Sequence, residues 1–391
     1  MSQQLINRSP DLKRLWDEGF EMEVKGGYLL VHHVPYLNSS GEIKYGVLVS
    51  TLTLAGEMTF KPDTHVAYFV GEAPCHKDRR RMDHIINSSG SYPLIGEVVA
   101  NHYLSSKPAA GYADYYEKMS TYVNILSAPA VSVDDTVTAR TSKVITVEGP
   151  EATFRYADSN SARARIDTVS AKLKGLKVAI VGLGGTGSYI LDLVAKTPVE
   201  AVHLFDGDTL LQHNAFRAPG APSVEKLLER MKKVDYFREI YSNMHLNITA
   251  HSQYIDASNV TALSSMDFVF LCLDRGEAKA MIIDYLCERN IPFIDVGIGI
   301  QRVEDALLGD VRVTTGTSKK KDHIKKRIPL VDEAENEYNT NIQIADLNAL
   351  NATLAVIKWK KLFGFYQDFE QEHHSTYSIN VNMLLSEDRE T

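Results

Sequence analysis

A glycine-rich turn between a short apolar run and a helical pattern constrains the fold more than any other feature of the chain. Residues 177–181 read KVAIV, which is typical of a buried strand. The turn that follows, residues 182–188, reads GLGGTGS and opens a helical pattern. Glycines permit a tight turn and close approach of an anion, and a helix N-terminus offers free N–H groups. The segment predicts a phosphate-binding turn of an α/β sheet.

The chain around and after this turn alternates between apolar strands and helices. Strands of this kind, separated by helices, predict a parallel sheet covered on both faces. The expected fold class is α/β, with a Rossmann-like, doubly wound and mostly parallel sheet. The expected strands are residues 177–181, 201–206, 248–251, 267–273, 291–296 and 375–384, and the expected helices are 159–175, 188–196, 223–241 (with Ser223 as its N-cap), 277–289 and 345–363.

The first part of the chain has a different pattern, typical of an α+β domain. Apolar, β-branched runs separated by turn residues predict strands at 27–36, 45–54 and 65–71, and helical patterns occur at 96–104 and 112–126. We therefore expect a smaller α+β domain over residues 1–145. A linker over 146–165 and the nucleotide-binding domain over 166–391 complete the expected organisation.

Composition excludes several classes of protein. The formal net charge is −8, which argues against sequence-independent nucleic-acid binding. No apolar run approaches the roughly 20 residues that span a bilayer, and residues 1–14 do not resemble a secretory signal, so we expect no membrane partner. The cysteines are Cys75, Cys272 and Cys287, widely spaced and without a CxxC pair. Such usage indicates a reducing, cytoplasmic location and no four-cysteine zinc site.

Polar residues that follow the glycine turn separate two kinds of nucleotide chemistry. Asp206 ends the second strand, where an acid can bind ribose hydroxyls of either NAD or ATP. Hydride transfer needs little more, so an NAD-dependent oxidoreductase stays an alternative. An adenylating enzyme must also neutralise a triphosphate, which calls for cations and a metal-binding acid. The chain supplies Asp208, Asn214, Arg217, Lys226 and, at the end of an apolar strand, Asp274.

The ordered run GLGGTGS, LFDGD, HNAFR, a lysine and CLDR resembles the ThiF/MoeB/HesA family, which is related to ubiquitin-activating enzymes. The resemblance covers about residues 161–299. It implies that Arg217 and Lys226 contact the phosphates, and that Asp274 binds Mg²⁺ or orders the attacking carboxylate. It also implies a homodimer in which an arginine of one subunit reaches the partner's ATP, and the candidates here are Arg163, Arg165 and Arg155. The further nucleotide contacts that it implies are Gly182, Gly184, Gly185, Gly187, Asp206, Asp208 and Asn214.

The resemblance implies the reaction as well. ATP, with Mg²⁺, would adenylate the C-terminal carboxylate of a ubiquitin-like protein that ends in glycine, releasing pyrophosphate. The layout is similar to fusions in bacterial clusters for ubiquitin-like conjugation, which implies a conjugating-enzyme-like acceptor, a partner-binding role for residues 1–145 and a role in antiviral defence. Adenylation of a small molecule or a tRNA-modification substrate, and a scaffold without activity, stay open as alternatives.

The chain departs from many relatives in its cysteines. Those relatives capture the acyl group as a thioester on a loop that corresponds to about residues 311–346, where this chain has no cysteine. Cys272 and Cys287 lie in apolar patterns typical of core residues. Cys75 precedes a basic run, which would favour a thiolate. The simplest interpretation is adenylation without an enzyme-bound thioester, and the role of Cys75 stays open.

Overall fold

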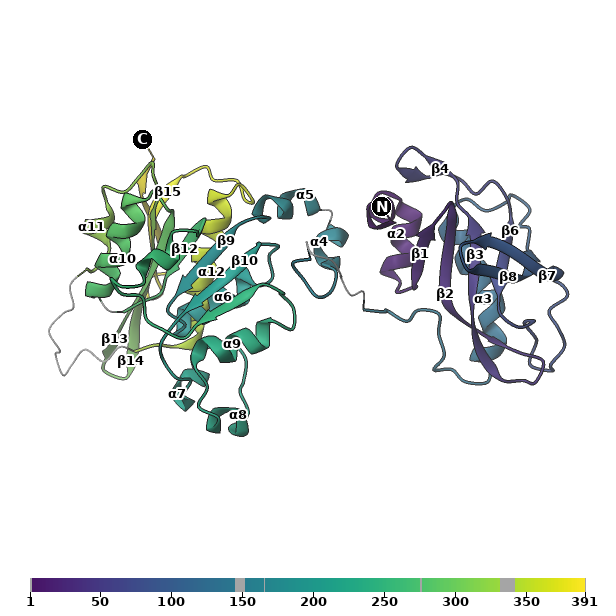
Figure 1. Ribbon diagram of the computed structural model, residues 1–391, viewed down its shortest axis with the longest axis horizontal. Coiled ribbons are helices and arrows are strands. Elements are labelled where there is room, and N and C mark those ends of the chain that lie inside the picture. Colours follow the sequence, from purple (N-terminus) through teal and green to yellow (C-terminus); the bar gives the residue numbers. More distant parts are fainter. Residues whose placement is uncertain (1, 145–151, 165, 275, 331–341, 391) are drawn as a thin grey trace. The chain divides into compact units, whose positions relative to one another are not determined.

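The computed structural model describes residues 2–144, 152–164, 166–274, 276–330 and 342–390 (Figure 1). The chain forms two compact units. The N-terminal unit comprises residues 1–145 with 162–165, and the C-terminal unit comprises residues 146–161 with 166–391.

The N-terminal unit is an antiparallel sheet of six strands, in the order β1-β2-β3-β6-β8-β7, packed against helices. The expected helix at 96–104 is wrong, because this stretch is strand β8. Its buried side chains, Ala100, His102 and Leu104, recur every second residue, which is the period of a strand. The elements are α1 (Ser2–Arg8), α2 (Pro10–Asp17), β1 (Met22–Lys25), β2 (Tyr28–Leu37), β3 (Ile43–Thr51), β4 (Leu54–Ala55), β5 (Met58–Thr59), β6 (Val66–Val70), β7 (Ile86–Ile95), β8 (Val98–Ser105) and α3 (Tyr115–Val131).

Helix α3 packs its aromatic and aliphatic face onto this sheet and buries a lysine there. Tyr115 and Tyr122 join the core of the unit. Lys118 is fully buried, and its Nζ donates to Ser50 Oγ at 2.8 Å and to the Thr64 carbonyl at 2.9 Å. Burial of the ammonium lowers the pKa of Lys118 from 10.5 to about 8. The charged form is therefore disfavoured in the folded protein.

We expect the stability of the N-terminal unit to increase between pH 8 and pH 10. Because the pKa of Lys118 is lower in the folded than in the unfolded chain, the unfolded chain binds more protons in this range. The free energy of unfolding should rise by about 1.4 kcal/mol per pH unit, and a Lys118→Met variant should lack this increment. Urea unfolding followed by the fluorescence of Trp16, in a Trp359→Phe background, measures it; equal slopes in both proteins would contradict it.

The C-terminal unit contains an eight-stranded sheet in the order β11-β10-β9-β12-β13-β14-β15-β16. Strands β9 to β13 pair in parallel, and β13 to β16 pair antiparallel, which confirms the mostly parallel α/β sheet. The strands are β9 (Lys177–Val181), β10 (Ala201–Phe205), β11 (Ile248–His251), β12 (Phe268–Leu271), β13 (Phe293–Val303), β14 (Ala306–Gly316), β15 (Glu372–Ser378) and β16 (Met383–Arg389).

Helices cover both faces of the parallel strands. Val178 and Ile180 of β9 pack with α6, α9 and α12, whereas Ala179 and Val181 pack with α10. This alternation is the two-residue period of a strand that is buried on both faces. The helices from residue 152 onward are α4 (Ser159–Ala164), α5 (Asp167–Ser170), η1 (Ala171–Leu173), α6 (Gly185–Val194), α7 (Gln212–Ala215), α8 (Val224–Leu228), α9 (Lys233–Tyr241), η2 (Val260–Leu263), α10 (Gly276–Glu288), α11 (Ile324–Arg327) and α12 (Ala345–Leu362).

Three elements of this unit differ from expectation. The helix expected at 223–241 begins at the Ser223 cap but breaks into α8 and α9, because Arg230 has a positive φ of 49° and Lys232 pairs with Thr209. Strand β14 was not expected, and the single strand expected at 375–384 is the hairpin β15–β16. The amphipathic helix expected at 159–175 is divided into α4, α5 and η1.

Candidate functional site

A cleft of about 470 Å³ lies at the carboxyl ends of strands β9 to β13. From β9 the chain proceeds to β10 and β11 on one side of the sheet and later to β12 and β13 on the other. The cleft is therefore at the switch point, where open α/β sheets bind ligands. Its lining includes Gly182, Gly184, Gly185, Asp206, Asp208, Arg217, Lys233, Tyr254, Ile255, Asp256, Cys272, Asp274, Val296, Gly297, Ile298, Gln343 and Asn348.

The glycine turn forms one wall of this cleft, and its positions require glycine for different reasons. Gly182 has φ +94°, and a Cβ there would lie 2.5 Å from the carbonyl oxygen of Cys272. A Cβ on Gly187 would lie 1.9 Å from the Gly182 carbonyl, and Gly187 does not line the cleft. A Cβ on Gly184, by contrast, would point into open space. Backbone packing thus requires Gly182 and Gly187, and Gly184 leaves room for a ligand.

Asp206 ties the glycine turn to the loop after β10. Its side chain is only 6% exposed and accepts hydrogen bonds from the backbone N–H groups of Leu183, at 2.7 Å, and Asp208, at 2.8 Å. Asp208 in turn pairs with Lys233 and accepts a hydrogen bond from the hydroxyl of Tyr254. Both acids line the cleft, so they are placed to face a nucleotide while they hold the two loops together.

The cations of the cleft are Arg217 and Lys233, and Lys226 does not line it. Arg217 Nε is buried and has no hydrogen-bond partner among the described residues. Lys233 Nζ lies 2.7 Å from Asp208 Oδ2 and 3.9 Å from Asp206 Oδ2. Lys226, on α8, instead pairs through Nζ with Glu229 at 3.0 Å and with Glu239 of α9 at 2.9 Å. The structure therefore brings Lys233 into the position that the sequence analysis gave to Lys226.

The remaining predicted residues lie in different environments. Asp274 lines the cleft, with Gln343 Nε2 at 3.4 Å from its carboxylate. Asn214 is buried and accepts a hydrogen bond from the Leu211 N–H at 2.9 Å, so it caps α7 and is not part of the cleft lining. Arg163 lies on α4 but its side chain, like all of Arg165, is outside the described residues. Arg155 Nε donates to the Ser242 carbonyl.

The electrostatics of the cleft leave a bound polyphosphate short of positive charge. Of the described lining residues two are cationic, and four are carboxylates, namely Asp206, Asp208, Asp256 and Asp274. No cluster of three histidine, cysteine or acidic side chains that could hold a metal occurs among the described residues. Mg²⁺ is commonly bound by one carboxylate together with substrate phosphates and water, which Asp274 could provide. The lining thus fits a magnesium–nucleotide better than a free polyphosphate.

The cysteines lie in environments that disfavour the thiolate. Cys75 is 1% exposed, and burial raises the pKa of its thiol despite the nearby Arg81. Its Sγ donates to the Ala73 carbonyl at 3.3 Å. Cys272 lines the cleft and is half-buried, and burial raises the pKa of its thiol strongly; burial also raises the pKa of the half-buried Cys287. A reactive cysteine needs a depressed pKa and access.

Tyr254 and Asn348 also line the cleft, and neither belongs to a motif that points to it. The ring of Tyr254 packs on Gly207, where a Cβ would lie 2.7 Å from the ring. Asn348 is 1% exposed on α12. The signal in the sequence was weak: a buried asparagine in a helical pattern indicates a polar contact, but not with which partner.

The fold defines an α/β protein with a cleft at the switch point of its sheet, and comparison with known families places it more narrowly. Residues 159–377 match the ThiF family, so the chain belongs to this family. Residues 10–159 match a domain of unknown function (DUF6791). No helix among the described residues has the length and apolar character needed to cross a membrane.

Individual relatives are distant. The tRNA threonylcarbamoyladenosine dehydratase of Escherichia coli (strain K12) is 26% identical over 31% of this chain and 45% of its own length. The ubiquitin-like modifier-activating enzyme 5 of Drosophila grimshawi is 26% identical over 36% of this chain and 37% of its own. The chain thus spans less than half of either relative. A crystal structure of E. coli MccB with ATP is 18% identical, with a TM-score of 0.43 over 57% of this chain and 66% of that one.

We expect Lys233→Ala to weaken ATP binding and Lys226→Ala to leave it nearly unchanged. Loss of a charged contact to phosphate typically costs about 2 kcal/mol, or roughly thirtyfold in affinity. Lys226 is satisfied by two glutamates outside the cleft, so its removal should change the affinity less than about twofold. Isothermal titration with ATP and Mg²⁺ compares the two. A loss of affinity in Lys226→Ala alone would return the role to Lys226.

Proposed function

We propose that this chain uses ATP and Mg²⁺ to adenylate the C-terminal carboxylate of a ubiquitin-like protein. The observation that carries the proposal is the cleft at the switch point of a ThiF-family sheet, which combines a glycine turn, two cations and Asp274. NAD-dependent hydride transfer needs no such cations around the phosphates, so the cleft favours adenylation over that alternative. The relatives' names, an activating enzyme and a tRNA dehydratase, suggest the same class of chemistry.

The residues of the cleft have distinct tasks in the proposed reaction. The substrate carboxylate attacks the α-phosphorus of ATP, an acyl–O–P bond forms, and the bond to the bridging oxygen breaks as pyrophosphate leaves. The N-terminus of α6 and the glycine turn would bind phosphate oxygens. Arg217 and Lys233 would offset the negative charge that grows on the leaving pyrophosphate. Asp274 would hold Mg²⁺, which supplies Lewis-acid stabilisation of the phosphates.

The shortage of positive charge in the cleft supports a further cation from elsewhere. Within one chain, four carboxylates outnumber two cations among the described lining residues. Mg²⁺ meets part of this need. We propose that Arg163 or Arg165 of a second copy meets the rest, which makes the active species a homodimer.

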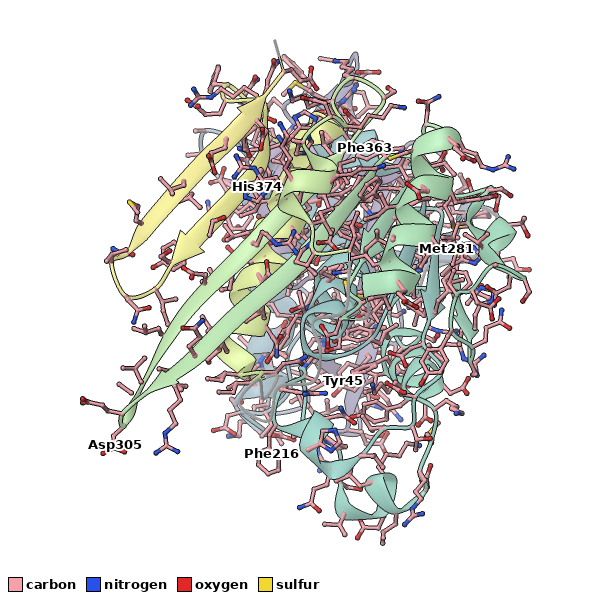
Figure 2. The ribbon with its side chains drawn as sticks, turned by 90° about the vertical axis from the view of Figure 1, so that its left-hand side faces the viewer. Tyr45, Phe216, Met281, Asp305, Phe363 and His374 are labelled. Carbon is pink, nitrogen blue, oxygen red and sulfur yellow. The ribbon has the colours of Figure 1, made fainter. Side chains whose placement is uncertain are left out.

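A sheet face beside the cleft, exposed among the described residues, supports a polypeptide substrate. Gly297 of β13 lines the cleft, and paired residues of an antiparallel sheet point to the same face. By this register Val303, Leu308, Met383 and Leu385 share the face of Gly297. Each of the four side chains is more than 40% exposed. Figure 2 shows Asp305 at the tip of the β13–β14 hairpin, which extends away from the helices of the unit. We call Val303, Leu308, Met383 and Leu385 together the distal apolar face.

A small molecule or a tRNA would not need such a face. Exposed apolar side chains that share one face of a sheet can mark a site of protein association, and here the polar residues Asp310, Thr376 and Ser378 lie between the four on the same face. The net charge of −8 also disfavours an RNA substrate. The substrate we propose therefore rests its folded part on the distal apolar face and extends its C-terminal tail past Gly297 into the cleft. With all three thiols disfavoured as nucleophiles, the acyl group would pass directly to a conjugating-enzyme-like acceptor, and the N-terminal unit is the proposed binding site of a partner.

We expect ATP–pyrophosphate exchange that depends on a ubiquitin-like protein with an intact C-terminal glycine. Asp274→Ala should lower the exchange rate at least a hundredfold, since it removes stabilisation of the developing charge. Arg163→Ala and Arg165→Ala identify which arginine acts. Radiolabelled pyrophosphate incorporation into ATP measures the rate. Exchange supported by a small carboxylic acid or by tRNA, but not by the protein, would favour the alternative substrates, and ATP binding without any exchange would favour a scaffold.

We expect Leu385→Asp to raise the KM for the protein substrate and Leu384→Asp to leave it nearly unchanged. The two residues are adjacent on β16 and similarly exposed, 45% and 53%, but point to opposite faces. Burying an unpaired carboxylate in an apolar interface should cost about 2 kcal/mol or more, hence roughly thirtyfold in KM. Exchange at varied substrate concentration provides the measurement. Equal effects of both variants would speak against the distal apolar face as the docking surface.

A further inference from the structure

Helix α12 places two buried asparagines one turn apart beneath the cleft. Asn348 and Asn351 are 1% and 0% exposed. Because residues three apart share one side of a helix, both amides face the sheet and α6. Buried amides of this kind are costly unless they are hydrogen-bonded, so their partners indicate what they hold in place.

Asn348 connects the glycine turn to the loop that carries Arg217. Its Oδ1 accepts a hydrogen bond from the Thr186 hydroxyl at 2.9 Å, and its Nδ2 donates to the Arg217 carbonyl at 3.2 Å. A Cβ on Gly185 would lie 2.0 Å from Nδ2, so the amide lies directly against the first turn of α6. Gly185 and Arg217 both line the cleft, and Asn348 does so as well. One side chain thus fixes the separation of two phosphate-facing groups.

Asn351 makes a matching contact to the opposite wall. Its Nδ2 donates to the carbonyl of Gly297 on β13 at 2.9 Å, whereas its buried Oδ1 has no hydrogen-bond partner among the described residues. Gly297 lies on the side of the cleft that faces the proposed acyl substrate, away from the glycine turn. The two asparagines have the same chemistry, burial and helix, but they hold different walls.

We propose that Asn348 is a positioning residue for the nucleotide, which sets the glycine turn and Arg217 at the spacing that ATP phosphates require. This inference rests on the proposed function, since it assigns a role within the same reaction. Asn348 acts through its neighbours: the turn and Arg217 bind the phosphates, and the amide keeps them from moving apart. Asn351 performs the equivalent task for the strand that carries Gly297. Small displacements of such groups are expensive, because binding and reaction depend on alignment within about 1 Å.

The experiment compares Asn348→Leu with Asn351→Leu in the full chain. Leucine has a similar volume but no hydrogen-bonding groups, so each variant loses only its amide contacts. ATP binding is measured by isothermal titration with Mg²⁺, and the thermal unfolding midpoint of each variant is recorded. We expect Asn348→Leu to weaken ATP binding about tenfold or more, and Asn351→Leu to change it less than twofold although both lower the unfolding midpoint. Thr353→Val, on the exposed side of α12, controls for altered helix composition.

A smaller change tests the same contact without a large loss of stability. Thr186→Val removes only the hydroxyl that donates a hydrogen bond to Asn348 Oδ1, so it should weaken ATP binding. Its effect should also be non-additive with Asn348→Leu, because both variants break one contact. If Asn348→Leu does not fold, Thr186→Val alone decides: unchanged affinity overturns the proposal.

The outcomes separate this inference from the proposed function. Wild-type protein that binds no ATP overturns the proposed function and this inference with it. Wild-type protein that binds ATP, together with an Asn348→Leu variant of equal affinity, overturns the positioning role alone. Equal weakening by Asn348→Leu and Asn351→Leu also overturns it, since the effect would then follow from lost stability.

Discussion

The close backbone contact between the glycine turn and the end of β12 is the constraint on which the site depends. Gly182 lies so near the carbonyl of Cys272 that no side chain fits between them, and a Cβ on Gly187 would lie nearer still to the Gly182 carbonyl. The first contact joins the end of β9 to the end of β12 at the switch point of the sheet, and the second closes the turn on itself. The carboxylate of Asp206 then fastens the turn to β10 through the Leu183 N–H. These contacts hold the ends of β9, β10 and β12 together, and the cleft forms where they meet.

The local part of this arrangement could be predicted from the sequence. Strand β9 and the helix after the turn follow from apolar periodicity and glycine chemistry, which act over a few residues. Asp206 and Asp274 stand at strand ends, so the topology alone puts them at the carboxyl edge of the sheet. Arg217 follows from its motif, and it lines the cleft.

Other parts depend on contacts between residues that are distant in the sequence. Lys233 enters the cleft because the helix breaks at Arg230 and restarts after Lys232 pairs with Thr209, a tertiary event that helical periodicity does not encode. Asn348 bonds to residues 131 and 162 positions away. Strand β8 shows the same limit of prediction from sequence, since the alternation of its buried residues depends on its place within the sheet.

The raised pKa of the three thiols has a kinetic consequence for the proposed chemistry. An acyl-adenylate is a mixed anhydride that water attacks, and transfer to a thiolate would convert it into a longer-lived thioester. Here burial raises the pKa of each thiol, which disfavours the thiolate that such an exchange needs. On the proposed mechanism the activated group is then productive only while it stays shielded in the cleft. The timing of the acceptor's arrival, rather than the rate of activation, would set the fraction of ATP turnovers that end in transfer instead of hydrolysis.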